Sequence, residues 1–382
     1  MLHLSIHLHI HRQLILPYLV GLNLIGMEQQ PHHLPDETKL NETGSPSEKH
    51  GTAYYMKYGL GKGWLGILFA VLMIITFGFA YNSVQSNTIC LAWQKAFGID
   101  PATMGIVLTL LTLLIIFGGI QRVAKFSSTV VPVMAIIYLL IAVGVVIWNI
   151  TCLPQVLLTI VENAFGFNQA AGGVLGVTVI QGIKRGLFSN EAGEGSAPNA
   201  AAAATVSHPV KQGLIQALGV FTDTLVVCSC TAFIILVSGV DVTASNGIQL
   251  TQDALTHEIG SIGNPFVAVM IWLFAFSSII GNYYYGETNV RYIKDSKLGV
   301  FIYRLAVAAM VMIGAVVSLD FAWSFADITM ALLTLCNLVA IVLLSRQAVF
   351  LLQDYRQQKK EGKNPVFSKD KMPEIADQLE AW

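Results

Sequence analysis

The chain has 382 residues, of which 54% are hydrophobic and 12% charged, and its formal net charge at pH 7 is −1. Apolar runs long enough for the roughly 20 helical residues that cross a bilayer core exclude a soluble globular protein and indicate an all-α polytopic membrane protein. The basic residues are scattered over short loops, which excludes nucleic acid as a partner.

Residues 1–50 differ in character from the rest of the chain. They hold seven of the nine histidines, and their single apolar run, residues 14–25, is too short to cross a bilayer. Histidine-rich tracts can bind metals, but no ligand geometry follows from this one. The polar stretch 27–50 predicts disorder, and the absence of a basic region before a proper apolar core argues against a signal peptide.

Eight apolar segments follow and are predicted as helical spans. They cover residues 64–84, 102–120, 130–148, 170–183, 213–237, 266–285, 301–318 and 322–344. The fourth is too short to cross alone, so it needs part of the next stretch, "GLFSNEAGEGSAPNAAAAA" at 186–204. We therefore expect a membrane domain over residues 51–352, with about eight crossings, and a cytoplasmic tail over residues 353–382.

Lysine and arginine gather in alternate loops, which predicts the orientation of the spans in the cytoplasmic (inner) membrane. Basic residues follow the second, fourth, sixth and eighth spans, whereas the loops after the fifth and seventh spans carry acids alone. Lys95 is the single exception. Strict alternation counts the fourth span and its following stretch as one crossing, and it places both termini in the cytoplasm.

The fourth span and its following stretch are rich in glycine and contain Pro198. An interior Gly costs about 1 kcal/mol and Pro about 3 kcal/mol relative to Ala, so we expect the helix to be interrupted between Gln181 and Ser196. Unwound backbone at membrane depth must be buried in protein or line a wet cavity, and in transporters it holds substrate. Alternatively, the small residues allow close helix packing and the glutamates lie in an interfacial loop.

Long motifs in this region resemble the alanine/glycine:cation symporter family, the sodium:alanine symporters. They are "GIKRGLFSNEAGEGSAPNAAAAA", "HPVKQGLIQALGVFTDTLVVC", "FAFSSIIGNYYYGETN" and "YNSVQSNTI". The resemblance covers residues 51–352 and implies a leucine-transporter-type fold with two inverted five-helix repeats. It also implies symport of a small neutral amino acid such as alanine or glycine with Na⁺ or H⁺, without any other cofactor.

The resemblance also shows one departure from the family pattern. The family begins with further membrane helices, including a first broken helix, before the element that Tyr54 and Tyr55 match, and residues 1–50 do not resemble that region. The fold is therefore expected to lack its first helices. Because an inverted-repeat site is built from both broken helices, the alternative function is that of a transport-inactive, truncated remnant of such a symporter.

Three residues are expected to bind substrate near the break or in the first span. The resemblance places Gln85 in the helix that lines the pocket, where its neutral amide can hydrogen-bond an amino acid; a plain polar residue at a helix end is the alternative. Gln181 and Gly182 stand at the predicted break, where exposed backbone could meet the ligand. For these two the alternative is a packing role.

The sixth span carries the predicted cation site. The resemblance implies that Ser277 and Ser278, with the backbone carbonyl of Phe274, bind the coupling cation, and hard cations prefer such oxygen ligands. The alternative is that both hydroxyls bond a carbonyl of their own helix. Asn282 is four residues from Ser278 and shares its helix face, so Ser278 and Asn282 are also predicted to contact substrate.

Acidic residues complete the set of candidates. Asp223 lies about ten residues into the fifth span, where a carboxylate is costly and indicates a functional or paired role. Thr222, Thr224 or the pair Lys184 and Arg185 could satisfy it, and structural pairing and a proton relay both stay open.

If the break falls near Gly182, Glu191 and Glu194 are expected to approach the cytoplasmic vestibule, without a catalytic role. No nucleophile–base pair and no metal motif occurs in the spans, so an enzyme is not predicted. The five cysteines lack zinc-site spacing and are expected to be apolar filler. The oligomeric state stays open.

Overall fold

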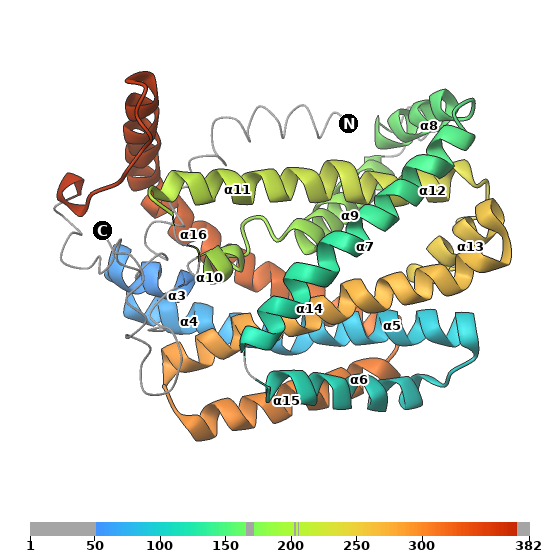
Figure 1. The fold of residues 1–382 in the computed structure, drawn as a ribbon, viewed down its shortest axis with the longest axis horizontal. Coiled ribbons are helices and arrows are strands. Elements are labelled where there is room, and N and C mark those ends of the chain that lie inside the picture. The colour runs from blue at the N-terminus through green and yellow to red at the C-terminus, as the bar shows by residue number, and fades with distance from the viewer. Residues whose placement is uncertain (1–50, 119, 166–171, 202–203, 205, 373–382) are drawn as a thin grey trace.

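The computed structural model describes residues 51–118, 120–165, 172–201, 204 and 206–372. Every regular element in these residues is a helix, which confirms an all-α membrane protein (Figure 1). The first half contains α3 (Thr52–Tyr54), η2 (Tyr55–Gly59), α4 (Gly63–Met73), η3 (Ile74–Tyr81), α5 (Asn82–Phe97), α6 (Pro101–Ile116), α7 (Ile120–Trp148), α8 (Leu153–Phe165) and α9 (Gly172–Asn190). The second half contains α10 (Ala197–Ala201), α11 (Pro209–Thr222), η4 (Asp223–Val227), α12 (Cys228–Val237), α13 (Ile248–Ile259), η5 (Gly260–Ile262), α14 (Gly263–Ile293), α15 (Lys297–Val316), α16 (Leu319–Lys360) and η6 (Lys369–Lys371).

Five helical segments of the described chain have the length and apolar composition of a membrane crossing. They contain the first, fifth, sixth and eighth predicted spans and all but the last two residues of the seventh. The third predicted span belongs to a helix pair bent by 101° between residues 148 and 153, which makes a sixth crossing if the pair counts as one. The second is a shorter helix of 16 residues, α6. Residues 172–183 of the fourth lie in α9, and the number of eight crossings stays a prediction.

Large apolar side chains point outward along most of these helices. Leu114, Leu140, Leu218 and Leu335 each expose more than half of their surface. In water such faces would be a liability, whereas lipid tails cover them at no cost. This distribution is what membrane embedding requires.

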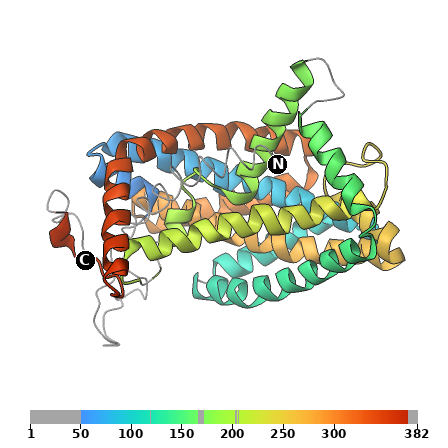
Figure 2. The ribbon, with the colours of Figure 1, turned by 90° about the horizontal axis from the view of Figure 1, so that it is seen from above.

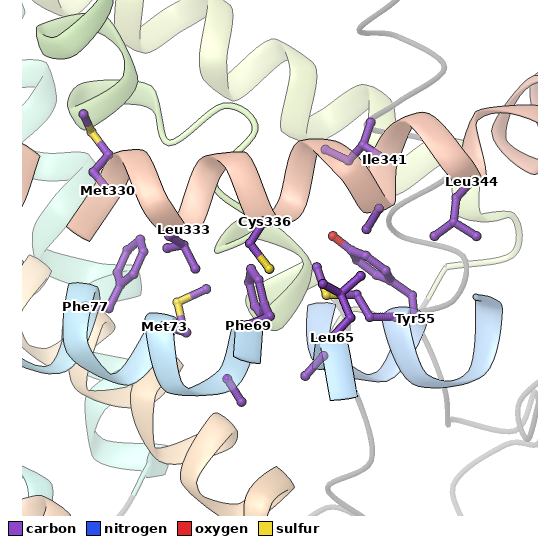
Figure 3. Packing of buried hydrophobic residues seen from close by; sticks show 14 of the residues in the cluster. Tyr55, Leu65, Phe69, Met73, Phe77, Met330, Leu333, Cys336, Ile341 and Leu344 are labelled. Carbon is purple, nitrogen blue, oxygen red and sulfur yellow. The ribbon is translucent and has the colours of Figure 1, made fainter. Parts of the chain in front are cut away.

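The largest core cluster joins the beginning of the described chain to its end. In Figure 3 the side chains of Tyr55, Phe69 and Phe77 point toward α16, where Leu333 and Cys336 meet them. All five are buried. Figure 2 shows the result from above: α16 lies along one edge of the molecule with α4 and η3 beside it.

A second cluster holds α5, α14, α15 and α6 together. Glycines let these helices approach closely: a Cβ built on Gly314 of α15 would lie 2.5 Å from the Cα of Ser83 in α5. Polar side chains then cross the contact, since the Ser86 hydroxyl donates to the Val311 carbonyl at 2.7 Å and the Asn87 amide donates to the Gly314 carbonyl at 3.1 Å. Apolar packing and these hydrogen bonds together hold the four helices in contact.

Helix ends follow local sequence signals. Asp100 caps α6 by accepting hydrogen bonds from the backbone N–H groups of Ala102 and Thr103, with Pro101 at the first helical position. Ser296 and Ser318 cap α15 and α16 in the same manner. At the other end of α5, Gly98 takes the left-handed conformation that ends a helix, with a φ of 68°.

Two contacts bear on the predicted orientation. Lys95, the exception to the charge pattern, forms a 2.6 Å ion pair with Asp253 in α13, so it is bound by the acidic loop region. Lys211, at the start of α11, donates to the side chain of Asn364 at 2.8 Å. The basic loop after the fourth predicted span and the C-terminal tail therefore lie on the same side of the molecule. Residues 1–50 and 373–382, for which disorder and a tail were expected, lie outside the described residues.

Candidate functional site

The helix of the fourth predicted span is interrupted between α9 and α10. α9 ends at Asn190 and α10 begins at Ala197, so the unwound segment covers residues 191–196, inside the interval expected from the sequence. Gly193 and Gly195 have φ angles of 95° and 84°, values that favour glycine, and Glu191 has a φ of 53°. A non-glycine residue in this conformation costs on the order of 1–3 kcal/mol and is held only by its surroundings.

The carbonyl groups of the unwound segment are bound by side chains from elsewhere in the fold. The Asn337 amide of α16 donates to the Gly193 carbonyl at 2.8 Å. The Gly195 carbonyl accepts from the Thr52 hydroxyl of α3 and from the Asn199 amide of α10. Because lipid offers no partner for free backbone groups, these contacts make an unwound segment possible at this depth.

A cavity of about 250 Å³ lies beside the unwound segment. It is formed by the end of α9, the unwound segment, α10, α11, η4 and one side chain of α14. The lining residues are Ser189, Asn190, Glu191, Ala192, Gly193, Gly195, Ala197, Pro198, Ala200, Gln216, Gly219, Val220, Asp223 and Tyr285. The volume is below the roughly 300–1,000 Å³ of sites for drug-sized ligands, so the cavity suits a small solute.

The polar groups of this cavity favour positive charge. Glu191 and Asp223 both line it, and no lysine or arginine of the described chain forms an ion pair with either. The Ser189 hydroxyl donates to Asp223 at 2.5 Å. The C-terminal end of α9 also borders the cavity, and a helix C-terminus carries a partial negative charge. An ammonium group or a metal cation is therefore the complementary ligand.

The partners expected for Asp223 are corrected by the structure. Lys184 and Arg185 pair instead with Asp327 of α16, and the Arg185 guanidinium stacks over the ring of Trp323 at 3.9 Å. Thr224 accepts a 2.9 Å hydrogen bond from Asn190. Because Asp327 binds both cations, neither of them forms an ion pair with Asp223 in this structure.

The placement of Gln181 and Gly182 at the break is wrong. Both lie inside α9, both are exposed, and no heavy atom lies within 4 Å of a Cβ built on Gly182. A helix tolerates an isolated glycine at about 1 kcal/mol, which is less than the several kcal/mol of each unsatisfied backbone group in lipid. The helix therefore continues past these residues and ends only where side chains can replace its hydrogen bonds.

The three residues of the predicted cation site lie together in α14. Their hydrogen bonds are those of the alternative interpretation, in which both serine hydroxyls bond a carbonyl of their own helix. The Ser277 and Ser278 hydroxyls both donate to the Phe274 carbonyl, at 2.8 Å and 3.1 Å. Three oxygen atoms thus converge within one turn of α14. None of these residues lines the 250 Å³ cavity, and their role in binding a cation stays a prediction.

The remaining substrate candidates, Asn282 and Gln85, belong to α14 and α5, two helices that pack against each other. Asn282 is buried and donates to the side-chain oxygen of Asn82 at 3.2 Å. Gln85, one turn further along α5, is half-buried. Neither lines the cavity, whereas Asp223 does, so the structure separates the candidates into two groups.

Several residues that form the site were not expected from the sequence. Asn337 stands within the last apolar span, where a polar side chain at membrane depth is itself a signal of function. Tyr55 of η2 donates to the Asn337 side-chain oxygen, and Tyr81 of η3 donates to Glu194. The break does not fall near Gly182, so the condition for a vestibule position of Glu194 is not met, and its side chain has no exposed surface.

An interrupted membrane helix with a small cavity at the break, lined by two carboxyl groups, is typical of one class of protein, the secondary transporters. The sequence model described as the sodium:alanine symporter family matches residues 41–369, and the chain belongs to this family. Its members are transporters and not enzymes, and membership supports cation-coupled amino-acid transport.

Curated relatives agree with this assignment. The chain is 54% identical over 321 residues to the probable sodium/glutamine symporter GlnT of Bacillus subtilis, a match that covers 84% of this chain and 67% of the relative. It is 52% identical over 332 residues to the amino-acid carrier protein AlsT of the same organism, with 87% and 71% covered. It is 34% identical over 326 residues to the sodium/alanine symporter AgcS of Methanococcus maripaludis, with 82% and 71% covered.

Proposed function

We propose that this chain carries out symport of a small neutral amino acid with Na⁺ or H⁺, and that the cavity beside residues 191–196 holds the substrate. The observation that carries the proposal is the convergence of Glu191, Asp223 and the C-terminal end of α9 on one small cavity at a helix break. A zwitterion presents an ammonium group that these groups complement.

The cavity wall favours a small side chain. Ala192, Ala197 and Ala200 line it, together with Tyr285 of α14. An amino acid whose ammonium faces the carboxylates would place its side chain against this wall. We propose alanine or glycine as substrates on this ground. Glutamine appears in the name of one relative, so it is the alternative substrate to test.

The coupling cation is proposed to bind at Phe274, Ser277 and Ser278. The two hydroxyls and the carbonyl supply oxygen atoms within one helical turn, and Na⁺ prefers oxygen ligands. Gln85, Asn282 and Ser278 are proposed to contact substrate from this second region, and Gln181 and Gly182 keep their predicted roles only if the substrate path follows the exposed face of α9.

The proposed arrangement in the membrane is an inverted-repeat fold in the inner membrane, with both termini in the cytoplasm. The contact of Lys211 with Asn364 supports one shared side for the basic loop and the tail. Lys95 follows the first predicted span and Asp253 follows the fifth, so their ion pair supports one shared side for these two loops, which we propose is the side opposite the cytoplasm. Basic segments on the cytoplasmic side follow the positive-inside rule.

The direct test uses the full chain reconstituted into liposomes. Uptake of labelled alanine, glycine and glutamine would be measured with an inward Na⁺ gradient, with an inward H⁺ gradient, and with neither. We expect uptake of alanine or glycine above that of protein-free liposomes, driven by one of the two gradients. Equal uptake with and without both gradients, or uptake of glutamine alone, would contradict the proposal.

A further inference from the structure

Glu194 lies in the middle of the unwound segment and differs from the acids that line the cavity. Its side chain has no exposed surface. Both of its carboxyl oxygens lie close to the Tyr81 hydroxyl, at 2.8 Å and 2.9 Å. In the described part of the chain no lysine or arginine forms an ion pair with it, and it is absent from the cavity wall. A buried carboxyl group with one neutral partner needs a reason to be there.

Tyr81, on the other side of this contact, is packed between aromatic rings. It is the last residue of the π-helical segment η3, and such segments recur at functional sites. Its ring packs against Phe77 at 4.7 Å and against Phe188 of α9 at 4.6 Å between ring centroids, and it is buried. Packing therefore determines where the hydroxyl group points.

The neighbours of Glu194 are bound by two further elements. Asn337 of α16 holds the Gly193 carbonyl, and Thr52 of α3 holds the Gly195 carbonyl. Gly193, Glu194 and Gly195 are thus attached to α16, η3 and α3, in that order. The Glu194 N–H also donates to the Glu191 carbonyl at 3.1 Å, which links this attachment to the acid that lines the cavity.

We propose that Glu194 is a positioning residue: with Tyr81 it anchors the unwound segment to η3 and so determines where Glu191 lies in the cavity wall. The proposal rests on the proposed function only for its transport readout. The side chain acts as a hydrogen-bond acceptor in this role, so an amide of the same shape can replace it. A role as a carrier of the coupling proton would instead require the carboxyl group itself.

Four variants of the full chain separate these roles. Glu194→Ala removes the acceptor, Tyr81→Phe removes the donor but keeps the packed ring, and Glu194→Gln keeps an acceptor oxygen. Tyr303→Phe is the matched control, because the Tyr303 hydroxyl donates to the Tyr283 carbonyl at 3.2 Å, in the contact between α14 and α15. Each variant is measured by hydrogen–deuterium exchange of residues 191–196 in detergent and by the KM and maximal rate of alanine uptake.

We expect exchange over residues 191–196 to rise about tenfold in Glu194→Ala and Tyr81→Phe, with a rise of KM of similar size, equivalent to about 1.4 kcal/mol. Glu194→Gln and Tyr303→Phe should stay within about twofold of the unmodified chain. If exchange in Tyr81→Phe is unchanged, the proposal is overturned, and this variant alone tests the proposal if Glu194→Ala fails to fold.

Loss of uptake in Glu194→Gln with normal exchange would also overturn the positioning role. Absence of uptake in the unmodified chain would contradict the proposed function, and the exchange data would still test the positioning role.

Discussion

Asn337 of α16 and Gly193 of the unwound segment are joined by a 2.8 Å hydrogen bond across 144 positions of the chain. The same asparagine accepts a hydrogen bond from Tyr55 of η2. One buried amide thus connects the last long helix, the segment η2 near the beginning of the described chain, and the helix break. The contact gives a freed carbonyl group of the unwound backbone a hydrogen-bond partner inside an apolar bundle.

Removing this amide should destabilise the protein. In Asn337→Ala the Gly193 carbonyl and the Tyr55 hydroxyl both lose their partner, and each unsatisfied buried group costs on the order of 1–3 kcal/mol. We expect a lower midpoint of thermal unfolding in detergent. Combining Asn337→Ala with Tyr55→Phe should cost less than the sum of the two single changes, because they share one interaction. Additive effects would contradict the connection.

The two acids of the cavity wall should control substrate affinity. In Glu191→Gln and in Asp223→Asn the cavity loses one negative charge, so the ammonium group of the substrate loses a complementary partner. We expect the KM of alanine uptake to rise about tenfold, or about 1.4 kcal/mol, with normal insertion. Asp320→Asn, at an exposed position in the first turn of α16, is the control. A KM unchanged in both cavity variants would remove the cavity from the transport path.

The hydroxyl pair of α14 should control the dependence on Na⁺. Changing Ser277 and Ser278 together to Ala removes two small groups that contribute little to packing but supply two of the three proposed oxygen ligands. We expect a higher Na⁺ concentration at half-maximal uptake. The matched control is Ser345→Ala, whose hydroxyl donates to the Val342 carbonyl at 2.8 Å on the exposed side of α16. If both variants keep the Na⁺ affinity of the unmodified chain, the pair is not a cation site.

His208, which caps α11 beside the tail, should make stability depend on pH. Its Nδ1 accepts from the Val210 N–H at 3.2 Å, so Nε2 carries the proton toward Asp354, also at 3.2 Å, and the ring is neutral. Burial lowers the pKa of His208 below its ordinary value. The unfolded chain therefore binds a proton more readily as the pH falls through about 6.5, and stability is lost in that direction.

The check is the midpoint of thermal unfolding between about pH 7.5 and pH 5.5. We expect it to fall on acidification, and to fall less in His208→Asn, since asparagine also caps a helix but does not titrate in this range. Equal slopes in the two proteins would show that His208 does not contribute.

The close contact of α5 and α15 should exclude any side chain at Gly314. A Cβ there would lie 2.5 Å from the Ser83 Cα and 2.6 Å from the Ser83 carbonyl oxygen, both backbone atoms that cannot rotate away. Overpacking of this kind costs about 1–3 kcal/mol, so Gly314→Ala should lower the unfolding midpoint. Gly144→Ala, where nothing lies within 4 Å, should leave it unchanged or raise it. A stable Gly314→Ala variant would show that the two helices can separate.

Local patterns of the chain were enough to predict the membrane helices and the class of protein. The lengths of the apolar runs predicted where the membrane helices form. The caps Asp100, Ser296 and Ser318, which the structure shows, are equally local, because each binds backbone groups within one turn. The glycine-rich stretch also predicted an interruption before Ser196. The family assignment rests on long motifs that are read directly along the chain.

The tertiary structure alone decided where the break falls and which side chains form the site. The sequence predicted the break at Gln181 and Gly182, yet the helix ends at Asn190. Beyond that point Asn337 and Thr52, from distant segments, bind the freed carbonyl groups. Lys184 and Arg185 were candidates for Asp223, yet α16 brings Asp327 to them instead. Hydrogen-bond partners separated by more than a hundred positions are set by packing, and sequence spacing along one helix carries no information about them.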